Sequence, residues 1–353
     1  MDSFTHGGNI YYYSKLLGCN ANEIIDLSSN ISPFVDENIF EFIKNQISSL
    51  KNLPSSNAII LKEALANKYD KEMENFVVGA GTSEIIKNLC LINSGKKALI
   101  IAPTYIDYER YCKLYNLQIN FHFASEKRNF AINLQELDFS KFDIVFICNP
   151  NNPTGYYIEK DDILRIAKRF ENCMFVIDES YHPFMSNSDN KSLLFEKSKN
   201  IIVLRSFSKI YGLAGLRIGY AFSFNKEIIR EIEKHCLEWG VNSLSEVVGK
   251  YLLSIKTDKI ASKINEIKNY LYEELKDCNN IKLFSSATNF VLIKLYHLNS
   301  EEVFTKLLSN KILIRDCKNI RGLDDSFIRV AIKDLDSMRY FLSILKKIVG
   351  CEN

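Results

Sequence analysis

The chain has 353 residues, more than one domain usually contains, so we expect two domains in one polypeptide. Its composition, 46% hydrophobic and 25% charged residues with a net charge of +2, is that of a globular protein and carries no basic footprint for nucleic acid. The N-terminus lacks the basic start and apolar stretch of a signal peptide, and no run reaches the roughly 18 apolar residues of a membrane span, so we expect a cytoplasmic protein that acts on small molecules, with neither nucleic acid nor membrane as a partner.

Cysteine and histidine spacing argues against a metal centre. The nine cysteines are scattered, form no C-x-x-C pair, and several lie in apolar runs, as Cys148 does in "IVFICNP". Buried reduced thiols are therefore expected rather than disulfides or a metal cluster. The five histidines show no H-E-x-x-H spacing, so no metal is expected.

Short apolar runs alternate with helical patterns through the first two thirds of the chain. Each run has the length of a strand, and several end in Gly, Pro, Asn or Ser, as strands do in a sheet covered by helices on both faces. The runs are "NFVVGAG" (75–81), "KALIIAP" (97–103), "FDIVFICNP" (142–150), "CMFVIDES" (173–180), "NIIVLRSF" (200–207) and "LRIGYAF" (216–222). Residues 83–93 and 160–170 show the three- and four-residue apolar spacing of helices. We predict an α/β domain with a mainly parallel sheet between helices.

The pattern changes from about residue 241. Long amphipathic helical patterns are followed by the apolar runs 289–296, 311–317 and 327–333 and by a last helix. This arrangement predicts a smaller α+β domain that the N-terminal segment joins. We therefore expect a large domain at 37–240 and a small domain formed by 1–36 and 241–353.

The first motif after a predicted strand is "GAGTSE" (Gly79–Glu84). Glycines permit a tight turn, and free N–H groups at a helix start can hold a phosphate. Because Glu84 replaces the last glycine of the G-x-G-x-x-G fingerprint, the stretch by itself favours a plain strand-to-helix turn.

Two further motifs follow the next strands. "NPNNPTG" (Asn149–Gly155) predicts a rigid turn whose side-chain amides can be aimed, although a purely structural turn would use similar residues. "VIDES" places Asp178 at a strand end with Tyr181 three residues on. The commoner role of such an acid is to cap a helix.

The fourth motif is "RSFSKIYGLAGLRIGY" (Arg205–Tyr220), in which Lys209 and Arg217 follow a buried strand. A single lysine there is usually only a solvated side chain. Together, however, the four motifs supply an acid, an amide, a phosphate-type turn and two cations at the edge of the sheet where α/β folds bind ligands. A lysine for the covalent link, an acid for the ring nitrogen, and an arginine with hydroxyls for the phosphate are the groups that hold pyridoxal 5′-phosphate (PLP).

With these motifs in this order, the chain resembles the fold-type I PLP enzymes of the class I and II aminotransferase group over essentially its full length. The resemblance implies a homodimer, because the active sites of this group are built at a subunit interface. It also implies residue roles: Lys209 would carry the cofactor, Asp178 would pair with the ring nitrogen, and Asn152 and Tyr181 would bond the phenolic oxygen. Tyr108 would stack on the ring. The phosphate would be held by Gly81, Thr82, Ser83, Ser206, Ser208 and Arg217.

Two branches of the group are most similar: histidinol-phosphate aminotransferase and the threonine-phosphate decarboxylase of corrinoid (cobalamin) synthesis. "HGGNIYYYSKLLG", "IIDLSSNISPF" and "KILIRDCKNIRGLDDSFIRVAIK" resemble the two ends of the decarboxylase, which favours a PLP-dependent lyase. A frayed N-terminus is the alternative interpretation of the first stretch. Two positions depart from the pattern. Leu53-Pro54 replaces a usual Tyr-Pro, whose tyrosine reaches the cofactor phosphate of the neighbouring subunit, and Tyr181 stands where the decarboxylase often has phenylalanine.

The expected substrate is a phosphorylated amino acid, L-threonine O-3-phosphate or a close analogue such as serine phosphate. Decarboxylation requires the carboxylate to stand perpendicular to the ring, whereas an arginine that holds it in the plane favours transamination. Arg329 is the expected carboxylate ligand, and Arg315 and His6 are the candidates for the substrate phosphate. A surface ion pair is the alternative for Arg315. The predicted substrate site is His6, Gly7, Asn9, Asn152, Arg315 and Arg329.

Two other function classes fit less well. A catalytically silent, PLP-binding regulatory protein would usually carry an added DNA-binding segment, for which neither the length nor the charge leaves room. A nicotinamide-dependent dehydrogenase would need the full glycine fingerprint, which is absent.

Overall fold

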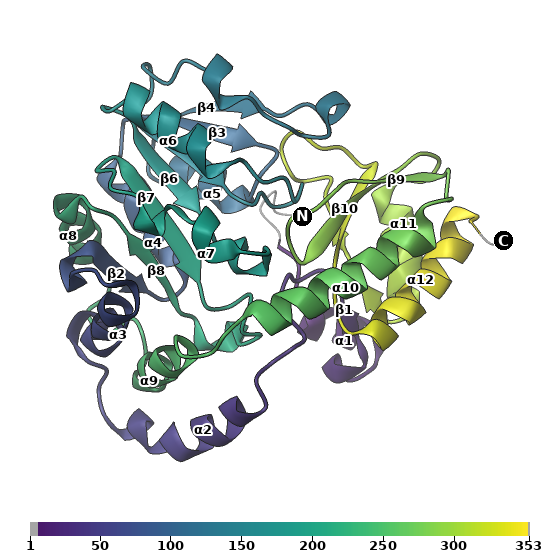
Figure 1. Cartoon of the computed structure of the whole chain (residues 1–353). Coiled ribbons are helices and arrows are strands. Elements are labelled where there is room, and N and C mark those ends of the chain that lie inside the picture. Colours follow the sequence, from purple (N-terminus) through teal and green to yellow (C-terminus); the bar gives the residue numbers. More distant parts are fainter. Residues whose placement is uncertain (1–5, 352–353) are drawn as a thin grey trace.

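The computed structural model describes residues 6–351. Its larger part is built on a sheet with the strand order β2-β8-β7-β6-β5-β3-β4, and its smaller part on a sheet with the order β12-β13-β10-β9. Figure 1 shows the two parts side by side, with the long helix α10 (Asp258–Leu275) running across both.

The large sheet is mainly parallel, as the sequence predicts. Within the described residues, β8 is the one strand of this sheet that runs opposite to the others, and it pairs in antiparallel fashion with β2 on one side and β7 on the other. The strands are β2 (Phe76–Gly79), β3 (Lys97–Ala102), β4 (Gln118–Phe123), β5 (Ile144–Cys148), β6 (Met174–Asp178), β7 (Ile201–Ser206) and β8 (Gly219–Phe222). β4, an edge strand in which no residue is fully buried, is absent from the predicted strands.

Helices cover both faces of this sheet because successive side chains on each strand point to opposite faces. In β5, Ile144 and Phe146 pack with α4, α5 and α8, while Val145 and Ile147 pack with α3, α6 and α9. The helices are α2 (Asn38–Gln46), α3 (Ile59–Tyr69), α4 (Thr82–Ile92), α5 (Ile106–Leu114), α6 (Lys160–Arg169), α7 (Ser188–Lys191), α8 (Lys226–Lys234) and α9 (Ser243–Leu252). The sheet is buried on both faces, which explains the continuous apolar runs of its strands.

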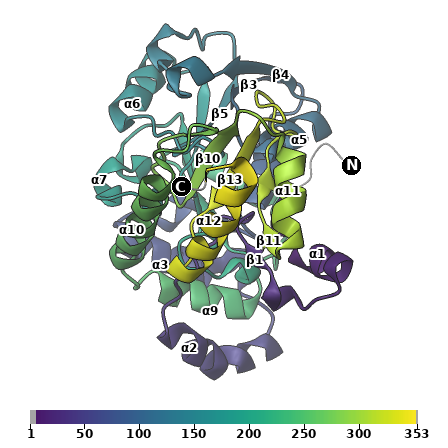
Figure 2. The same ribbon diagram turned by 90° about the vertical axis from the view of Figure 1, so that its right-hand side faces the viewer.

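The smaller part is an antiparallel sheet with helices packed on it, together with N-terminal elements (Figure 2). β1 pairs in parallel with β11, so the N-terminal segment does join this part. The remaining elements are α1 (Ile10–Leu17), β1 (Ile25–Asp26), β9 (Ile281–Leu283), β10 (Phe290–Leu295), α11 (Ser300–Ser309), β11 (Ile312–Leu313), β12 (Arg315–Asp316), β13 (Phe327–Ala331) and α12 (Leu335–Val349).

The helix α9 lies with the larger part, although the predicted small domain begins at residue 241. Val248 and Leu252 of α9 are buried in the same cluster as Leu61 and Leu65 of α3. Figure 1 shows α9 close to α3 and α2, away from the smaller sheet. From this packing we propose that the division lies between α9 and α10.

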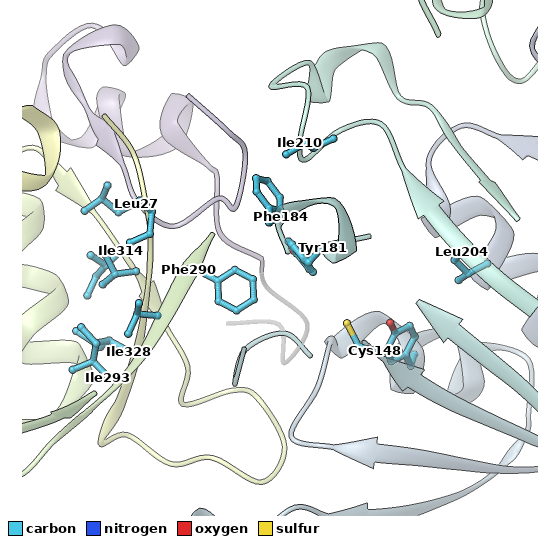
Figure 3. Close-up of a cluster of buried hydrophobic side chains, with 14 of the residues drawn as sticks. Leu27, Cys148, Tyr181, Phe184, Leu204, Ile210, Phe290, Ile293, Ile314 and Ile328 are labelled. Atoms are coloured by element: carbon cyan, nitrogen blue, oxygen red, sulfur yellow. The ribbon is translucent and has the colours of Figure 1, made fainter. Parts of the chain in front are cut away.

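The two parts meet through apolar contacts beside the carboxyl ends of the large-sheet strands. Tyr181 and Phe290 lie edge to face with ring centroids 5.1 Å apart, and Figure 3 shows Phe290 of the smaller part pointing toward Tyr181 and Phe184. This contact fixes the smaller sheet over the strand ends that carry the predicted motifs.

The expectation that all cysteines are reduced is wrong for one pair. Cys278 and Cys351 form a disulfide across 73 residues of chain, a separation that no local spacing reveals. It joins the end of α12 to the turn before β9. The other seven cysteines are free, and five of them are buried.

Within residues 6–351 there is no helix with both the length and the apolar character needed to cross a membrane.

Candidate active site

A cavity of about 230 Å³ lies between the carboxyl edge of the large sheet, the N-terminal segment and the smaller sheet. Because β5, β6 and β7 are parallel, their carboxyl ends meet at this edge, with Asp178 the last residue of β6 and Ser206 the last of β7. Fourteen of the sixteen predicted site residues line the cavity: His6, Gly7, Gly81, Thr82, Ser83, Asn152, Asp178, Tyr181, Ser206, Ser208, Lys209, Arg217, Arg315 and Arg329. Asn9 and Tyr108 do not.

Asp178 is a buried acid on the cavity wall. It accepts hydrogen bonds from the Tyr108 hydroxyl at 2.7 Å and from the Ser180 backbone N–H at 2.9 Å. Burial raises its pKa, while those hydrogen bonds and the nearby Lys209 oppose the rise. A carboxylate held in this way is suited to bind a protonated ring nitrogen.

The predicted stacking role of Tyr108 is corrected by its position. Tyr108 is fully buried, and its hydroxyl is directed to Asp178 from behind the cavity wall. Of the two tyrosines in "PTYIDYER", the one that lines the cavity is Tyr105, the N-cap residue of α5, three positions before Tyr108. The Tyr105 hydroxyl donates to Asp107 at 2.8 Å, which fixes the orientation of the ring.

Gly81 forms a tight turn between β2 and α4. It has φ +83°, and a Cβ there would stand 2.7 Å from Nη2 of Arg217. A Cβ at Gly219 on β8 would stand 2.5 Å from the Thr82 backbone nitrogen. These glycines let Arg217 and the start of α4 approach each other closely. The N-terminal N–H groups of α4, the side chains of Thr82 and Ser83, and Arg217 therefore form a cradle for a dianion.

Lys209 follows β7 and is half-buried in the cavity wall. Its carbonyl accepts a hydrogen bond from the Ser32 N–H at 2.9 Å, which ties the turn to the N-terminal segment. Burial, followed by the charges of Arg329 and Arg217, lowers the pKa of Lys209 to about 8. An amine with this pKa is a better nucleophile near neutral pH than an ordinary lysine.

Tyr181 is held by a residue that the sequence analysis did not single out. The Asn30 side-chain amide donates to the Tyr181 hydroxyl at 3.1 Å. Burial raises the pKa of Tyr181 to about 12, so the phenol remains a hydrogen-bond donor at neutral pH. Asn30 also lines the cavity. Its only sequence signal is its place in "IIDLSSNISPF", just after β1.

Arg315 and Arg329 are neighbours on β12 and β13. They are Cα partners in the antiparallel register, which places both on the same face of the smaller sheet. Arg329 donates to the Ser28 carbonyl at 2.6 Å and to the Asn152 side-chain oxygen. Arg315 donates to Asn319 at 2.5 Å. Both side chains are buried, and within residues 6–351 neither forms an ion pair, so the surface ion pair considered for Arg315 is not observed.

The N-terminal segment closes one side of the cavity. His6 Nε2 lies 3.0 Å from Asp107 Oδ1, and the Gly8 N–H donates to Ser28 Oγ at 2.7 Å. A Cβ at Gly7 would stand 2.5 Å from the Ser28 carbonyl oxygen, so the close approach requires glycine. Asn9, predicted to bind substrate, instead caps α1 by accepting from the Tyr12 N–H at 3.3 Å.

Most of the chain matches one known protein family. Residues 22–345 match the model of the aminotransferase class I and II family. The chain belongs to this family. Its members are PLP-dependent, which makes PLP the cofactor of this chain and the chain a PLP-dependent enzyme.

Relatives in this family carry two kinds of name. The adenosylcobalamin biosynthesis bifunctional protein CobDQ of Leptospira interrogans is 34% identical over 97% of this chain, which spans 41% of that protein. A histidinol-phosphate aminotransferase of Methanococcus aeolicus is 32% identical, and the match covers 94% of this chain and 91% of the relative. The crystal structure of L-threonine-O-3-phosphate decarboxylase from Porphyromonas gingivalis has a TM-score of 0.84 at 25% identity, covering 93% of this chain and 100% of that one.

The residues of the cavity fit PLP. Lys209 can bond the cofactor aldehyde, Asp178 can bind the ring nitrogen, and the cradle of Gly81, Thr82 and Arg217 can hold the phosphate. Two buried side-chain oxygens on the cavity wall, Asn30 Oδ1 and Ser180 Oγ, have no hydrogen-bond partner among the described residues. A polar ligand would satisfy such atoms.

Proposed function

We propose that this enzyme decarboxylates a phosphorylated amino acid, L-threonine O-3-phosphate or a close analogue such as serine phosphate. One observation carries the proposal: two buried arginines, Arg315 and Arg329, face the cavity from adjacent strands in addition to Arg217 of the phosphate cradle. If Arg217 binds the cofactor phosphate, two cations remain for the substrate. Two anionic groups, a carboxylate and a phosphate, match them.

Burial strengthens this argument. It lowers the pKa of both Arg315 and Arg329, because a desolvated guanidinium is costly without a counter-charge. Arg329 Nε is buried without a hydrogen-bond partner in residues 6–351. Anionic substrate groups would offset the desolvation of the two guanidinium groups and could accept a hydrogen bond from Arg329 Nε. His6, held by Asp107 at the rim of the cavity, could add a further donor to the substrate phosphate.

Lys209 has two tasks in this reaction. Its amine would hold the cofactor until the substrate amine takes its place, and its ammonium group could then deliver a proton to Cα. Loss of CO₂ leaves an electron pair at Cα, and bound PLP supplies the ring that accepts it. A pKa of about 8 lets Lys209 hold or release a proton near neutral pH. With PLP bound, the Tyr181 hydroxyl and the Asn152 side-chain amide could donate hydrogen bonds that orient the ring.

Transamination is the second candidate, and one contact favours it. Arg329 is fixed to Asn152, a residue expected to contact the ring, and could therefore hold a substrate carboxylate in the ring plane. The Cα proton would then leave to Lys209 in place of CO₂. Tyr181 stands where the decarboxylase often has phenylalanine, which also favours transamination. The relative from Methanococcus aeolicus is named histidinol-phosphate aminotransferase.

The deciding experiment is incubation of the PLP-loaded enzyme with L-threonine O-3-phosphate in the absence of any keto acid. The proposal expects CO₂ release over many turnovers with a stoichiometric phosphorylated amine. Lys209→Ala serves as the control, because any CO₂ that it releases does not come from the lysine-dependent reaction of the enzyme. Absence of CO₂, together with conversion of the cofactor to its amine form by histidinol phosphate, would replace the proposal with transamination.

We further propose that the enzyme is a cytoplasmic homodimer. Apolar side chains are exposed on α2 and the turns that follow it, as at Phe40 and Leu53, and also on the loop at Leu237 and Trp239. This loop lies beside the start of α3, since the Asn57 N–H donates to the Glu238 carbonyl at 3.2 Å. Apolar side chains gathered in this way are typical of a surface that a second copy covers.

A further inference from the structure

A buried polar cluster lies behind the cavity wall and touches none of the space that substrate would fill. It consists of Glu179, His182, Ser192 and Arg205, all of them buried. We call it the Glu179 cluster. Three of its members adjoin cavity-lining residues in sequence: Glu179 follows Asp178, His182 follows Tyr181, and Arg205 precedes Ser206.

The contacts of the Glu179 cluster join three segments of chain. Arg205 Nη2 lies 2.7 Å from Glu179 Oε2 and donates to Ser192 Oγ at 2.8 Å. The Glu179 carboxylate also accepts from the Ser192 hydroxyl and from the Leu193 N–H, each at 2.8 Å. The Glu179 N–H donates to the Leu204 carbonyl at 2.9 Å. One carboxylate thereby links the end of β6, the end of β7 and the segment after α7.

Stability alone does not account for this cluster. A buried ion pair gains little over apolar residues of similar volume, because desolvating both charges is costly. Two buried nitrogens, Arg205 Nε and His182 Nε2, lack partners within the described residues and add to that cost. The pair nevertheless stays charged. Burial is the largest single influence on Glu179 and raises its pKa. The charge of Arg205, together with the hydrogen bonds from Leu193 and Ser192, more than offsets burial, so the pKa of Glu179 is lowered. Burial lowers the pKa of His182 to about 4, so this ring is uncharged at neutral pH.

We propose that Glu179 and Arg205 are positioning residues for the cofactor, fixing the end of β6 relative to the end of β7. Asp178 must meet the ring, while Ser206, Ser208 and Lys209 must meet the phosphate and the aldehyde of the same rigid molecule. In the strand register, Asp178 is paired with Leu204, the residue directly before Arg205. A shift of the end of β6 relative to the end of β7 would therefore change the distance from Asp178 to the residues that bind the phosphate and the aldehyde. Sites of this kind tolerate displacements of only about 0.5 Å. The inference rests on PLP as cofactor and is independent of which substrate bond breaks.

The test compares Glu179→Gln with a matched control, Glu233→Gln. Glu233 forms a largely buried ion pair with Lys62 at 2.6 Å between α3 and α8, and neither residue lines the cavity. For each apoprotein we would measure the melting temperature, the dissociation constant of PLP and the circular dichroism of the bound cofactor. We expect Glu179→Gln to weaken PLP binding by about tenfold or more and to change the circular dichroism of the bound cofactor. At metal sites, loss of a residue that orients a metal ligand lowers the metal affinity by a similar factor. Glu233→Gln should change neither the PLP binding nor the dichroism.

Two results would overturn the proposal. One is a PLP dissociation constant and dichroism in Glu179→Gln equal to those of the unmodified enzyme. The other is an equal loss of PLP affinity in Glu233→Gln, which would reduce the effect to general destabilisation. If Glu179→Gln does not fold, Ser192→Ala replaces it, because it removes one contact to each charge and keeps both charges. Weaker PLP binding in this variant supports the positioning role, and unchanged binding rejects it.

Discussion

Arg329 shows how much one side chain in this site depends on its surroundings. Its two terminal nitrogens are committed to Ser28 and Asn152, two residues far apart in sequence, so the guanidinium plane is fixed before any substrate arrives. A fixed guanidinium loses little entropy on binding an anion. This rigidity is the physical reason to assign Arg329 to the substrate carboxylate.

Replacing Arg329 with leucine should therefore raise the Michaelis constant for L-threonine O-3-phosphate by about 10- to 100-fold, the cost of a charge-assisted hydrogen bond. The Michaelis constant of Arg329→Lys should lie between those of the unmodified enzyme and Arg329→Leu, because lysine keeps the positive charge but lacks the planar, bidentate guanidinium group. Steady-state kinetics measure both. Arg339→Leu, an exposed arginine on α12, is the control. An unchanged Michaelis constant in Arg329→Leu would remove this residue from the substrate site.

Lys209 should make the stability of the apoprotein depend on pH. Its folded-state pKa is about 8 against an ordinary value of 10.5, so between these values the unfolded chain binds more protons than the folded one. Stability from this group therefore rises as pH increases from about 8 to about 10.5. In denaturant unfolding, the apoprotein should gain on the order of 1–3 kcal/mol over this range relative to apo Lys209→Met. A difference between the two proteins that stays constant with pH would contradict the lowered pKa.

At the scale of elements, the phosphate cradle depends on how closely β8 approaches the start of α4. Gly219 and Gly81 permit that approach, since a Cβ at either would meet Thr82 or Arg217 at under 3 Å. The sequence contains both glycines, but only the antiparallel pairing of β2 with β8, which sets Gly79 opposite Gly219, brings Gly219 beside the turn at Gly81 and Thr82.

Gly219→Ala should weaken PLP binding by about tenfold or more, because the new methyl group would displace the backbone of Thr82. Gly215→Ala is the matched control in the same motif, since a Cβ there meets no atom within 4 Å. PLP titration of both apoproteins gives the result. Equal affinity in the two variants would show that the cradle tolerates the displacement.

At the scale of the whole molecule, the unusual residue is Leu53. Leu53 is 73% exposed on the proposed dimer surface. The family resemblance implies a tyrosine at this position. If a second copy covers this surface, Leu53 faces the neighbouring active site without a hydroxyl to offer its phosphate.

The enzyme should therefore sediment as a dimer, and Trp239→Asp should shift it toward monomer, because a buried carboxylate would lack a partner. Leu53→Tyr should tighten PLP binding in the dimer, while Leu50→Tyr, also at an exposed position, should not. Analytical ultracentrifugation and PLP titration test the two statements separately. A monomer at all concentrations would refute the dimer and remove the basis for the second expectation.

The α/β class, six strands of the large sheet and most of the cavity-lining residues could be predicted from the sequence alone. This was possible because a doubly covered sheet requires continuous apolar strands and because the motifs sit directly at strand ends, where local order along the chain coincides with proximity in space. The edge strand β4 was not predicted, because no residue in it is fully buried and it therefore lacks a continuous apolar run.

The other features depend on how distant parts of the chain pack together. Tyr105 and Tyr108 are three residues apart in one motif, and the start of α5 at Ile106 alone determines which ring meets the cavity. Asn30, the Glu179 cluster and the Cys278–Cys351 disulfide each join segments that no spacing connects. The pairing of β12 with β13 places Arg315 and Arg329 side by side on one face of the smaller sheet. Side-chain roles of this kind depend on packing between distant elements, which local sequence patterns do not encode.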